Sequence, residues 1–266
     1  MKNNTSSPKL AFLLLLISIG FFSCNDSDVQ ERVLLPFSQI STYNDVRIHL
    51  VNGPHRIDIL GEGSISAVKW EQNGSHLHLK EINGLNPEYN IVQISTPSLE
   101  SICLKNSSQI YIPEEFFTSK TLDLQILDAG RLETNDRFIV DSLITIEARN
   151  AARIYIHELS AHLAEFDIHD GSRVDVGGQV NALVDLRVRN GARFHLDGDD
   201  HWFLNNPLSA PKFQIHLTDG GNAWVHATDT LQALVKNGSH LYYKSFEGHL
   251  HIEKQDGGNA TIKDEH

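Results

Sequence analysis

Residues 166–176 read FDIHDGSRVDV, and this stretch decides the fold. If Asp170 is counted as position zero, apolar residues stand at positions −4, −2, +4 and +6: Phe166, Ile168, Val174 and Val176. The residues between them are mostly polar. Alternation with a period of two on both sides of a short Asp-Gly-Ser triplet predicts a strand, a tight turn and a second strand.

The triplet recurs along residues 98–262, each time as Asn or Asp followed by two small residues. Its first members are Asn106, Asp128, Asn150, Asp170, Asn190, Asp219, Asn237 and Asp256. Consecutive hairpins would give the same local pattern, but regular spacing and apolar positions shared by most copies favour stacked coils. The sequence therefore predicts an all-β, single-domain parallel β-helix, a solenoid of about eight coils of ~20 residues each.

The first turn residue alternates between Asn and Asp through all eight copies. Asp side chains stacked at ~4.8 Å would repel one another, and interleaved Asn doubles their separation. Asp-to-Asn changes at Asp128 and Asp170 should therefore cost little. A Lys or Arg precedes each Asn of the repeats, and we expect it to lie near an Asp of the neighbouring coil: Lys105, Arg149, Arg189 and Lys236.

Outward positions after the turn line up from coil to coil and form a candidate binding face. Position +3 gives an arginine row, and position +5 supplies aromatic residues: Arg131, Arg153, Arg173 and Arg193, with Tyr111, Tyr155, Trp224 and Tyr242. Such a face could stack on sugar rings or pair with an anionic glycan. An ordinary solvated sheet face, with Glu133 and Asp175 offsetting the arginines, is the competing interpretation. Since no third partner accompanies Arg173 and Asp175, we predict no catalytic residues.

The N-terminus has the features of a targeting segment. Lys2 and Lys9 precede an apolar run over residues 10–22, which has the length of a signal-peptide core and is short for a membrane span. The small Ser23 directly before Cys24 resembles the lipobox of bacterial lipoproteins, although Phe21 stands where Leu is commoner. We predict a signal peptide over residues 1–23 and membrane anchoring through lipid on Cys24; an ordinary secretory signal is the alternative.

Residues 24–35 form an acidic tether that resembles lipoprotein surface-export signals. This predicts an outer-membrane lipoprotein at the cell surface, or otherwise in the periplasm. The chain carries 22 basic and 34 acidic residues, a formal charge of −12. That balance argues against nucleic acid as a partner, because nucleic-acid binding needs Lys and Arg to replace counterions.

Cysteine and histidine give little sign of chemistry. With Cys24 assigned to lipid, Cys103 has no intrachain partner and no accompanying His/Asn set. The i, i+2 pairs His76/His78 and His249/His251 share strand faces, but third and fourth metal ligands cannot be placed. We therefore predict no metal and no cofactor. Residues 197–201, DGDDH, lack the spacing of a calcium loop and are predicted to lie in an insertion packed down by Trp202, Phe203 and Pro207.

Several segments resemble the head GIN domain family, DUF2807, described as auto-transporter adhesins. They are Pro36–Ile40 followed by Asp45–Leu50, then His55–Gly61, Thr96–Ile102 and the eight turns. The resemblance covers roughly residues 36–262; Asn or Asp replaces the family's usual Gly at the first turn position, which leaves the turn type open. It implies a β-helix related in shape to pectin-lyase-like solenoids, and an adhesive role without a catalytic set.

These observations divide the chain into signal peptide, tether and solenoid, with residues 36–97 as a β-rich N-terminal cap and 98–262 as the repeats. Within the cap, Asn73-Gly74 marks either a hairpin turn or a ninth coil. The leading interpretation is a non-enzymatic, lipid-anchored envelope protein that binds a glycan or a surface protein. A polysaccharide-active enzyme and a purely structural envelope module are the alternatives.

Overall fold

The computed structural model describes residues 32–60, 68–82, 91–118, 120–195 and 208–263. All regular structure in these ranges is β. The strands are β1 (Arg32–Val33), β2 (Gln39–Thr42), β3 (Arg47–Asn52), β4 (Arg56–Leu60), β5 (Val68–Asn73), β6 (His76–Ile82), β7 (Ile91–Thr96), β8 (Ser101–Leu104), β9 (Gln109–Ile112), β10 (Phe116–Thr118), β11 (Leu122–Ile126), β12 (Arg131–Ala148), β13 (Arg153–Ile168), β14 (Arg173–Val188), β15 (Arg193–Phe194), β16 (Ser209–Leu217), β17 (Asn222–Val235), β18 (His240–Tyr243), β19 (His249–Lys254) and β20 (Asn259–Ile262).

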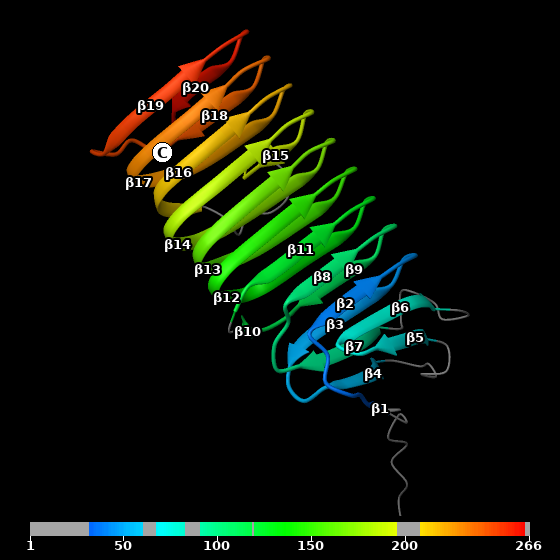
Figure 1. The fold of residues 1–266 in the computed structure, drawn as a ribbon. Helices are drawn as coiled ribbons and strands as arrows, with labels where there is room; N and C mark the ends of the chain where they lie inside the picture. Colours follow the sequence, from blue (N-terminus) through cyan, green and yellow to red (C-terminus); the bar gives the residue numbers. More distant parts are fainter. Residues whose placement is uncertain (1–31, 61–67, 83–90, 119, 196–207, 264–266) are drawn as a thin grey trace, which may run out of the picture.

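The chain winds into a parallel β-solenoid, which confirms the predicted fold class. Figure 1 shows the coils from β8 to β20 stacked in sequence order, with β19 and β20 at one end. At the other end, β2 and β3 lie between β8/β9 and the strands β4 to β7. Each central coil contributes three strand segments. In β12 these are residues 131–134, 137–140 and 143–148, separated by two breaks in the register with β13. We call the three resulting sheets the post-turn, back and pre-turn sheets, in that order along the chain.

All eight predicted turns have the same backbone conformation. The first and second turn residues are both left-handed, for example Asn190 at φ 53° and Gly191 at φ 69°. The amide of the third residue donates to the carbonyl of the residue before the turn, as Ala192 does to Arg189 at 3.2 Å. Two left-handed residues inside such a bond define a type I′ turn, which Asn-Gly and Asp-Gly favour.

Side chains of the turn residues bond in pairs between coils. Asn150 Nδ2 donates to Asp128 Oδ1 at 2.8 Å, and Asn190 and Asn237 donate in the same way to Asp170 and Asp219. The Asn/Asp alternation therefore builds amide–carboxylate hydrogen bonds as well as separating the charges. The basic residue before a turn Asn lies near an Asp of the neighbouring coil in two of the four copies, as expected. Arg189 Nη2 lies 3.1 Å from Asp167 Oδ2, and its charge also acts on Asp170. The charge of Lys236 acts on Asp219, whereas Arg149 bonds Glu147 of its own coil.

The alternating apolar residues fill one continuous core between the three sheets. Phe116 and Phe138 stack at 5.9 Å between ring centroids, and Phe166 meets Phe194 edge-on at 5.0 Å. The positions before and after each turn that the sequence predicted to point inward are buried in the central coils, such as Ile146 and Ile154. At the C-terminal end the last coil is mostly exposed, with Leu250 at 50%.

Residues 39–52 form a coil that the repeat spacing did not reveal. β2 and β3 flank a left-handed pair, Asn44 and Asp45, and continue the pre-turn and post-turn sheets below β8 and β9. Asn106 Nδ2 donates to Asn44 Oδ1 at 3.1 Å. The series of hydrogen bonds between turn side chains, which we call the turn ladder, therefore extends to this coil. It escaped detection because an insertion separates it from the repeats and because Asp45 replaces the usual small residue.

The rest of the predicted cap lies beneath this first coil. Asn73 pairs with His76 in an antiparallel hairpin of β5 and β6. Asn73-Gly74 is therefore a hairpin turn and not the turn of a ninth coil. β4 pairs antiparallel with β7, which itself runs parallel to β3. Antiparallel strands therefore replace coils at this end of the stack. Among the described residues, none forms a helix with the length and apolar character needed to cross a bilayer.

Candidate functional site

The predicted arginine row exists as a geometric row on the post-turn sheet. Arg131 is the register partner of Arg153, Arg153 of Arg173, and Arg173 of Arg193. Neighbouring parallel strands lie ~4.8 Å apart, so the four guanidinium groups rise from consecutive coils. Arg153 and Arg193 are exposed, whereas Arg131 and Arg173 are half-buried.

Acidic residues pair with part of this row. Arg131 Nη2 lies 2.7 Å from Glu133 Oε2, and Arg173 Nε lies 2.6 Å from Asp175 Oδ2. Within the described part of the chain, Arg153 forms no ion pair. The face therefore combines the two interpretations of the sequence: some arginines are offset by acids, and Arg153 is exposed without one.

The aromatic residues at position +5 are less accessible than their outward positions predicted. Tyr155 is 9% exposed, because the guanidinium groups of Arg131 and Arg173 lie 5.3 and 5.9 Å from its ring centre. Trp224 is 3% exposed, with Lys263 Nζ 4.7 Å from its ring centre and His195 beside it. The expected exposed aromatic stripe was wrong for these two residues, since flanking side chains cover them.

Tyr111 and Tyr242 remain half-buried on the same face. Tyr111 lies at a hollow of about 320 Å³ near the N-terminal coils, with His49, Arg47 and Arg131. The ring centroids of His49 and Tyr111 are 5.2 Å apart, and burial lowers the pKa of His49. A neutral imidazole, a phenol and two arginines, of which Arg131 is bonded to Glu133 of the same lining, form a polar hollow suited to a hydroxylated group.

A second hollow, of about 330 Å³, lies on the pre-turn sheet. Its lining includes two carboxylates, Asp185 and Glu253, together with Arg187, His216 and His251. Asp185 and Glu253 belong to β14 and β19, three strand steps apart through β16 and β17, or ~14 Å along the stack. Carboxylate pairs that cleave glycosidic bonds stand about 5–9.5 Å apart. This hollow therefore lacks the spacing of such a pair.

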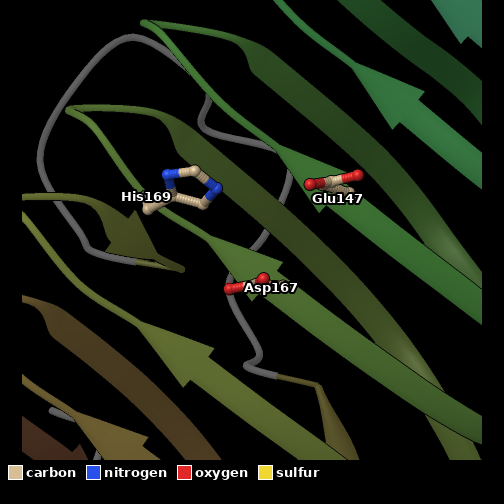
Figure 2. A group of neighbouring side chains, drawn as sticks. All are labelled: Glu147, Asp167 and His169. Atoms are coloured by element: carbon tan, nitrogen blue, oxygen red, sulfur yellow. The ribbon is translucent and has the colours of Figure 1, made fainter.

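A carboxylate–histidine cluster lies on the pre-turn sheet, and sequence reasoning missed it. Glu147 of β12, Asp167 of β13 and His169 just after β13 each offer a ligand atom, and these atoms all lie within 4.8 Å of one another (Figure 2). Glu147 and Asp167 are register partners. The available signal was the alignment of coils: both acids stand three residues before a turn, and His169 stands directly before one.

The residues that the sequence singled out for metal or thiol chemistry are arranged differently. The rings of His76 and His78 stack at 3.7 Å, and His78 Nδ1 lies 2.6 Å from Ser41 Oγ. In the described ranges, neither this pair nor His249/His251 joins a group of three metal-ligating residues. Cys103 is unpaired, and burial raises the pKa of its thiol, which favours the unreactive protonated form.

Several predictions concern residues outside the described ranges. These are the signal peptide, the lipid site Cys24 with most of the tether, and the insertion with Asp197–His201, Trp202, Phe203 and Pro207. They stay predictions.

The fold and its surfaces define a class: a parallel β-solenoid with type I′ turns of Asn and Asp and a cap at the N-terminal end. The chain belongs to the head GIN domain family, since the family model described as "Putative auto-transporter adhesin, head GIN domain" matches residues 36–246. The resemblance noted in the sequence is thereby confirmed. No curated protein matches the chain.

Solved structures share the fold at low sequence identity. A putative adhesin from Parabacteroides merdae is 13% identical over 88% of this chain and 94% of its own, with a TM-score of 0.68. A putative lipid binding protein from Parabacteroides distasonis is 12% identical over 89% and 96%, with a TM-score of 0.72. A putative adhesin from Bacteroides fragilis is 14% identical over 88% and 94%, with a TM-score of 0.57.

Proposed function

We propose that this protein is a non-enzymatic, lipid-anchored adhesin of the cell surface that binds anionic glycans on its post-turn sheet. Family membership supports the adhesive role, and the lipobox-like sequence before Cys24 supports the anchor. The observation that carries the choice of ligand is the arginine row, four guanidinium groups in register on consecutive coils. Guanidinium groups form bidentate bonds to carboxylate and sulfate-like groups.

The row is a local feature of an acidic protein. A formal charge of −12 repels polyanions at long range, so binding must arise from contacts at short range. A linear polyanion lying along the stack would meet Arg153 and Arg193, whose side chains are exposed. Arg131 and Arg173 would contribute by exchanging their acidic partners for the ligand. We therefore expect modest affinity with strong sensitivity to salt.

The arrangement of carboxylates supports binding over catalysis. Glu133 and Asp175 are each bonded to an arginine of the row, and the two acids of the pre-turn hollow stand ~14 Å apart by strand count. General acid–base cleavage of a polysaccharide needs two carboxyl groups across one bond. Glu147 and Asp167 of the pre-turn sheet do lie close together, with oxygens within 4.8 Å, but each of them is bonded to an arginine, Arg149 or Arg189.

A binding assay with charge-reversed variants tests the ligand. The full-length protein in detergent would be applied to immobilised polygalacturonate, heparin and neutral dextran at low and physiological salt. We expect retention on the polyanions, lost on Arg153→Glu/Arg193→Glu. The control Arg137→Glu/Arg187→Glu makes the same change of net charge at exposed arginines outside the row, and should bind like the wild type. Equal loss of retention in both variants would mean that binding depends on net charge alone, and would contradict the proposed binding face.

A protease accessibility experiment tests the location. Intact cells would be treated with a membrane-impermeant protease and blotted for this protein beside a periplasmic control. Loss of the protein with the control spared supports the surface adhesin. Protection that ends only on lysis would contradict adhesion to external targets and favour a periplasmic or structural role.

A further inference from the structure

We infer that Glu147, Asp167 and His169 form a binding site for a divalent transition-metal ion of the zinc type. The site lies on the pre-turn sheet, separate from the arginine row, and does not depend on the proposed glycan binding. Figure 2 shows the three side chains on neighbouring coils. Their ligand atoms lie within 4.8 Å of one another.

The strongest evidence is the orientation of His169. This residue is 7% exposed, and its Nδ1 lies 2.6 Å from Asp170 Oδ2. Because a carboxylate accepts hydrogen bonds, Nδ1 carries the proton, and in the neutral ring Nε2 then presents a lone pair. Nε2 is buried and has no hydrogen-bond partner. A buried acceptor without a partner is costly, and a metal ion is a partner that a neutral imidazole takes readily.

Asp170 itself is fixed by the turn ladder. Asn190 Nδ2 donates to Asp170 Oδ1 at 2.8 Å, while Oδ2 accepts from His169. A carboxylate that holds the second ring nitrogen sets the tautomer and the ring orientation of metal-ligating histidines. The repeat turn of this solenoid therefore supplies the outer support that such a site needs. Among the turn residues of the repeats, Asp170 is the one that directly follows a histidine.

Each carboxylate keeps one oxygen available for an ion. Arg149 binds Glu147 Oε1, and Arg189 Nη2 lies 3.1 Å from Asp167 Oδ2. Asp167 Oδ1 is buried and has no partner, like the histidine nitrogen. The arginines orient the acids and offset two of the three nearby negative charges, those of Glu147, Asp167 and Asp170. One net negative charge remains at the site. We therefore expect a dissociation constant for Zn²⁺ in the micromolar range, which is weaker binding than at a structural zinc site.

The donor set selects the class of ion. One imidazole nitrogen with two carboxylate oxygens suits Zn²⁺, whose ligands stand at about 2.0–2.2 Å. Atoms that bind one tetrahedral ion at these distances stand about 3.4 Å apart, so the three side chains, whose ligand atoms lie within 4.8 Å of one another, must move closer together when the ion binds. Ca²⁺ prefers six to eight oxygens and Mg²⁺ an octahedral set, which three protein atoms do not supply. Three protein ligands leave a fourth position open to water or to a donor from a binding partner.

Calorimetric titration tests the site. Full-length protein in detergent, stripped with EDTA and dialysed, would be titrated with ZnCl₂ and separately with CaCl₂. We expect one Zn²⁺ per chain and no heat from Ca²⁺. His169→Gln, Asp167→Asn and Glu147→Gln should each weaken Zn²⁺ binding by at least tenfold. Asp170→Asn should weaken it about 10–100-fold through the imidazole tautomer. His162→Gln, an exposed histidine of the same strand β13, is the matched control and should bind like the wild type.

Two results would overturn the inference. The first is no Zn²⁺ uptake by the wild type. The second is uptake that survives both His169→Gln and Asp167→Asn, which would place the ion elsewhere, for example at His249/His251. Circular dichroism of each variant separates loss of the site from loss of the fold, and the amide variants keep the shape of the acids they replace.

Discussion

Asn190 Nδ2 donates to Asp170 Oδ1 at 2.8 Å from one coil to the next, and this single bond links the repeat turn to a candidate metal site. The same carboxylate accepts from His169 through its other oxygen. Equivalent bonds join Asn150 to Asp128 and Asn237 to Asp219. The ladder therefore stabilises the stack at every second step, and at one step it also orients an imidazole.

Reversing the chemistry of one pair tests the ladder. Asn150→Asp would place two carboxylates at hydrogen-bond distance, and should lower the free energy of unfolding by about 1 kcal/mol at neutral pH and low salt. Asp128→Asn keeps the accepting oxygen and should change stability by less than about 0.5 kcal/mol. Urea unfolding at pH 7 and pH 3 measures both, since protonation should relieve Asn150→Asp. Equal losses in the two variants would mean that the Asp charge itself is required.

Stability should depend on pH through Asp170. The hydrogen bond from Asn190, and then that from His169, holds the pKa of Asp170 below its usual value. A depressed folded-state pKa contributes stability above the unfolded pKa of about 3.9, and this contribution is lost as the pH falls through the folded value. Asn190→Gly removes the largest cause and tolerates φ 53°. The free energy of unfolding of this variant should be lower than that of the wild type by about 0.5 kcal/mol, since the pair is partly exposed. Measured by urea unfolding, this difference should shrink below about pH 4. A deficit independent of pH would contradict this linkage.

The back sheet should carry much of the stability. Phe138 is fully buried and stacks on Phe116, so Phe138→Ala should cost about 3–5 kcal/mol through lost burial and a cavity. Phe117 lies on the neighbouring strand of the same sheet at 40% exposure, and Phe117→Ala should cost less than about 0.5 kcal/mol. Unfolding in urea compares the two. Similar costs would mean that the back sheet does not close the core.

Two glycines with left-handed backbone should respond differently to alanine. A Cβ on Gly178, at φ 104°, would lie 2.2 Å from the carbonyl oxygen of Leu159, so Gly178→Ala should cost more than about 3 kcal/mol. A Cβ on Gly171 meets nothing within 4 Å, and Ala151 occupies the equivalent turn position at φ 61°. Gly171→Ala should therefore cost about 1 kcal/mol. Thermal unfolding of the two variants checks the order, and a reversed order would contradict the close approach at Gly178.

Much of the fold could be predicted because its rules are local. Each turn needs two consecutive left-handed residues, and Asn or Asp followed by a small residue meets that need within three positions. Apolar residues two and four positions before each turn mark the core side of the strand. The back sheet escaped prediction, because segments of three or four residues such as 137–140 are too short to show an alternating pattern.

The candidate sites depended on contacts that no local pattern encodes. Alignment of the coils predicted that Arg131, Arg153, Arg173 and Arg193 form a row, since parallel stacking preserves register. It could not predict that Tyr155 lies covered between two of them, because that depends on where long arginine side chains settle. The same reasoning placed Trp224 on the surface, where neighbours bury it.

By itself, the sequence determined the solenoid, the spacing of its turns and the family to which the chain belongs. Only the tertiary structure decided that Asn44 begins the stack, that the Asn/Asp alternation is a hydrogen-bonded ladder, and that Glu147, Asp167 and His169 meet. The physical reason is the distance along the sequence over which each kind of interaction acts. Turn preference and strand alternation act over a few residues, whereas hydrogen bonds between coils and the burial of Nε2 of His169 join residues about twenty positions apart.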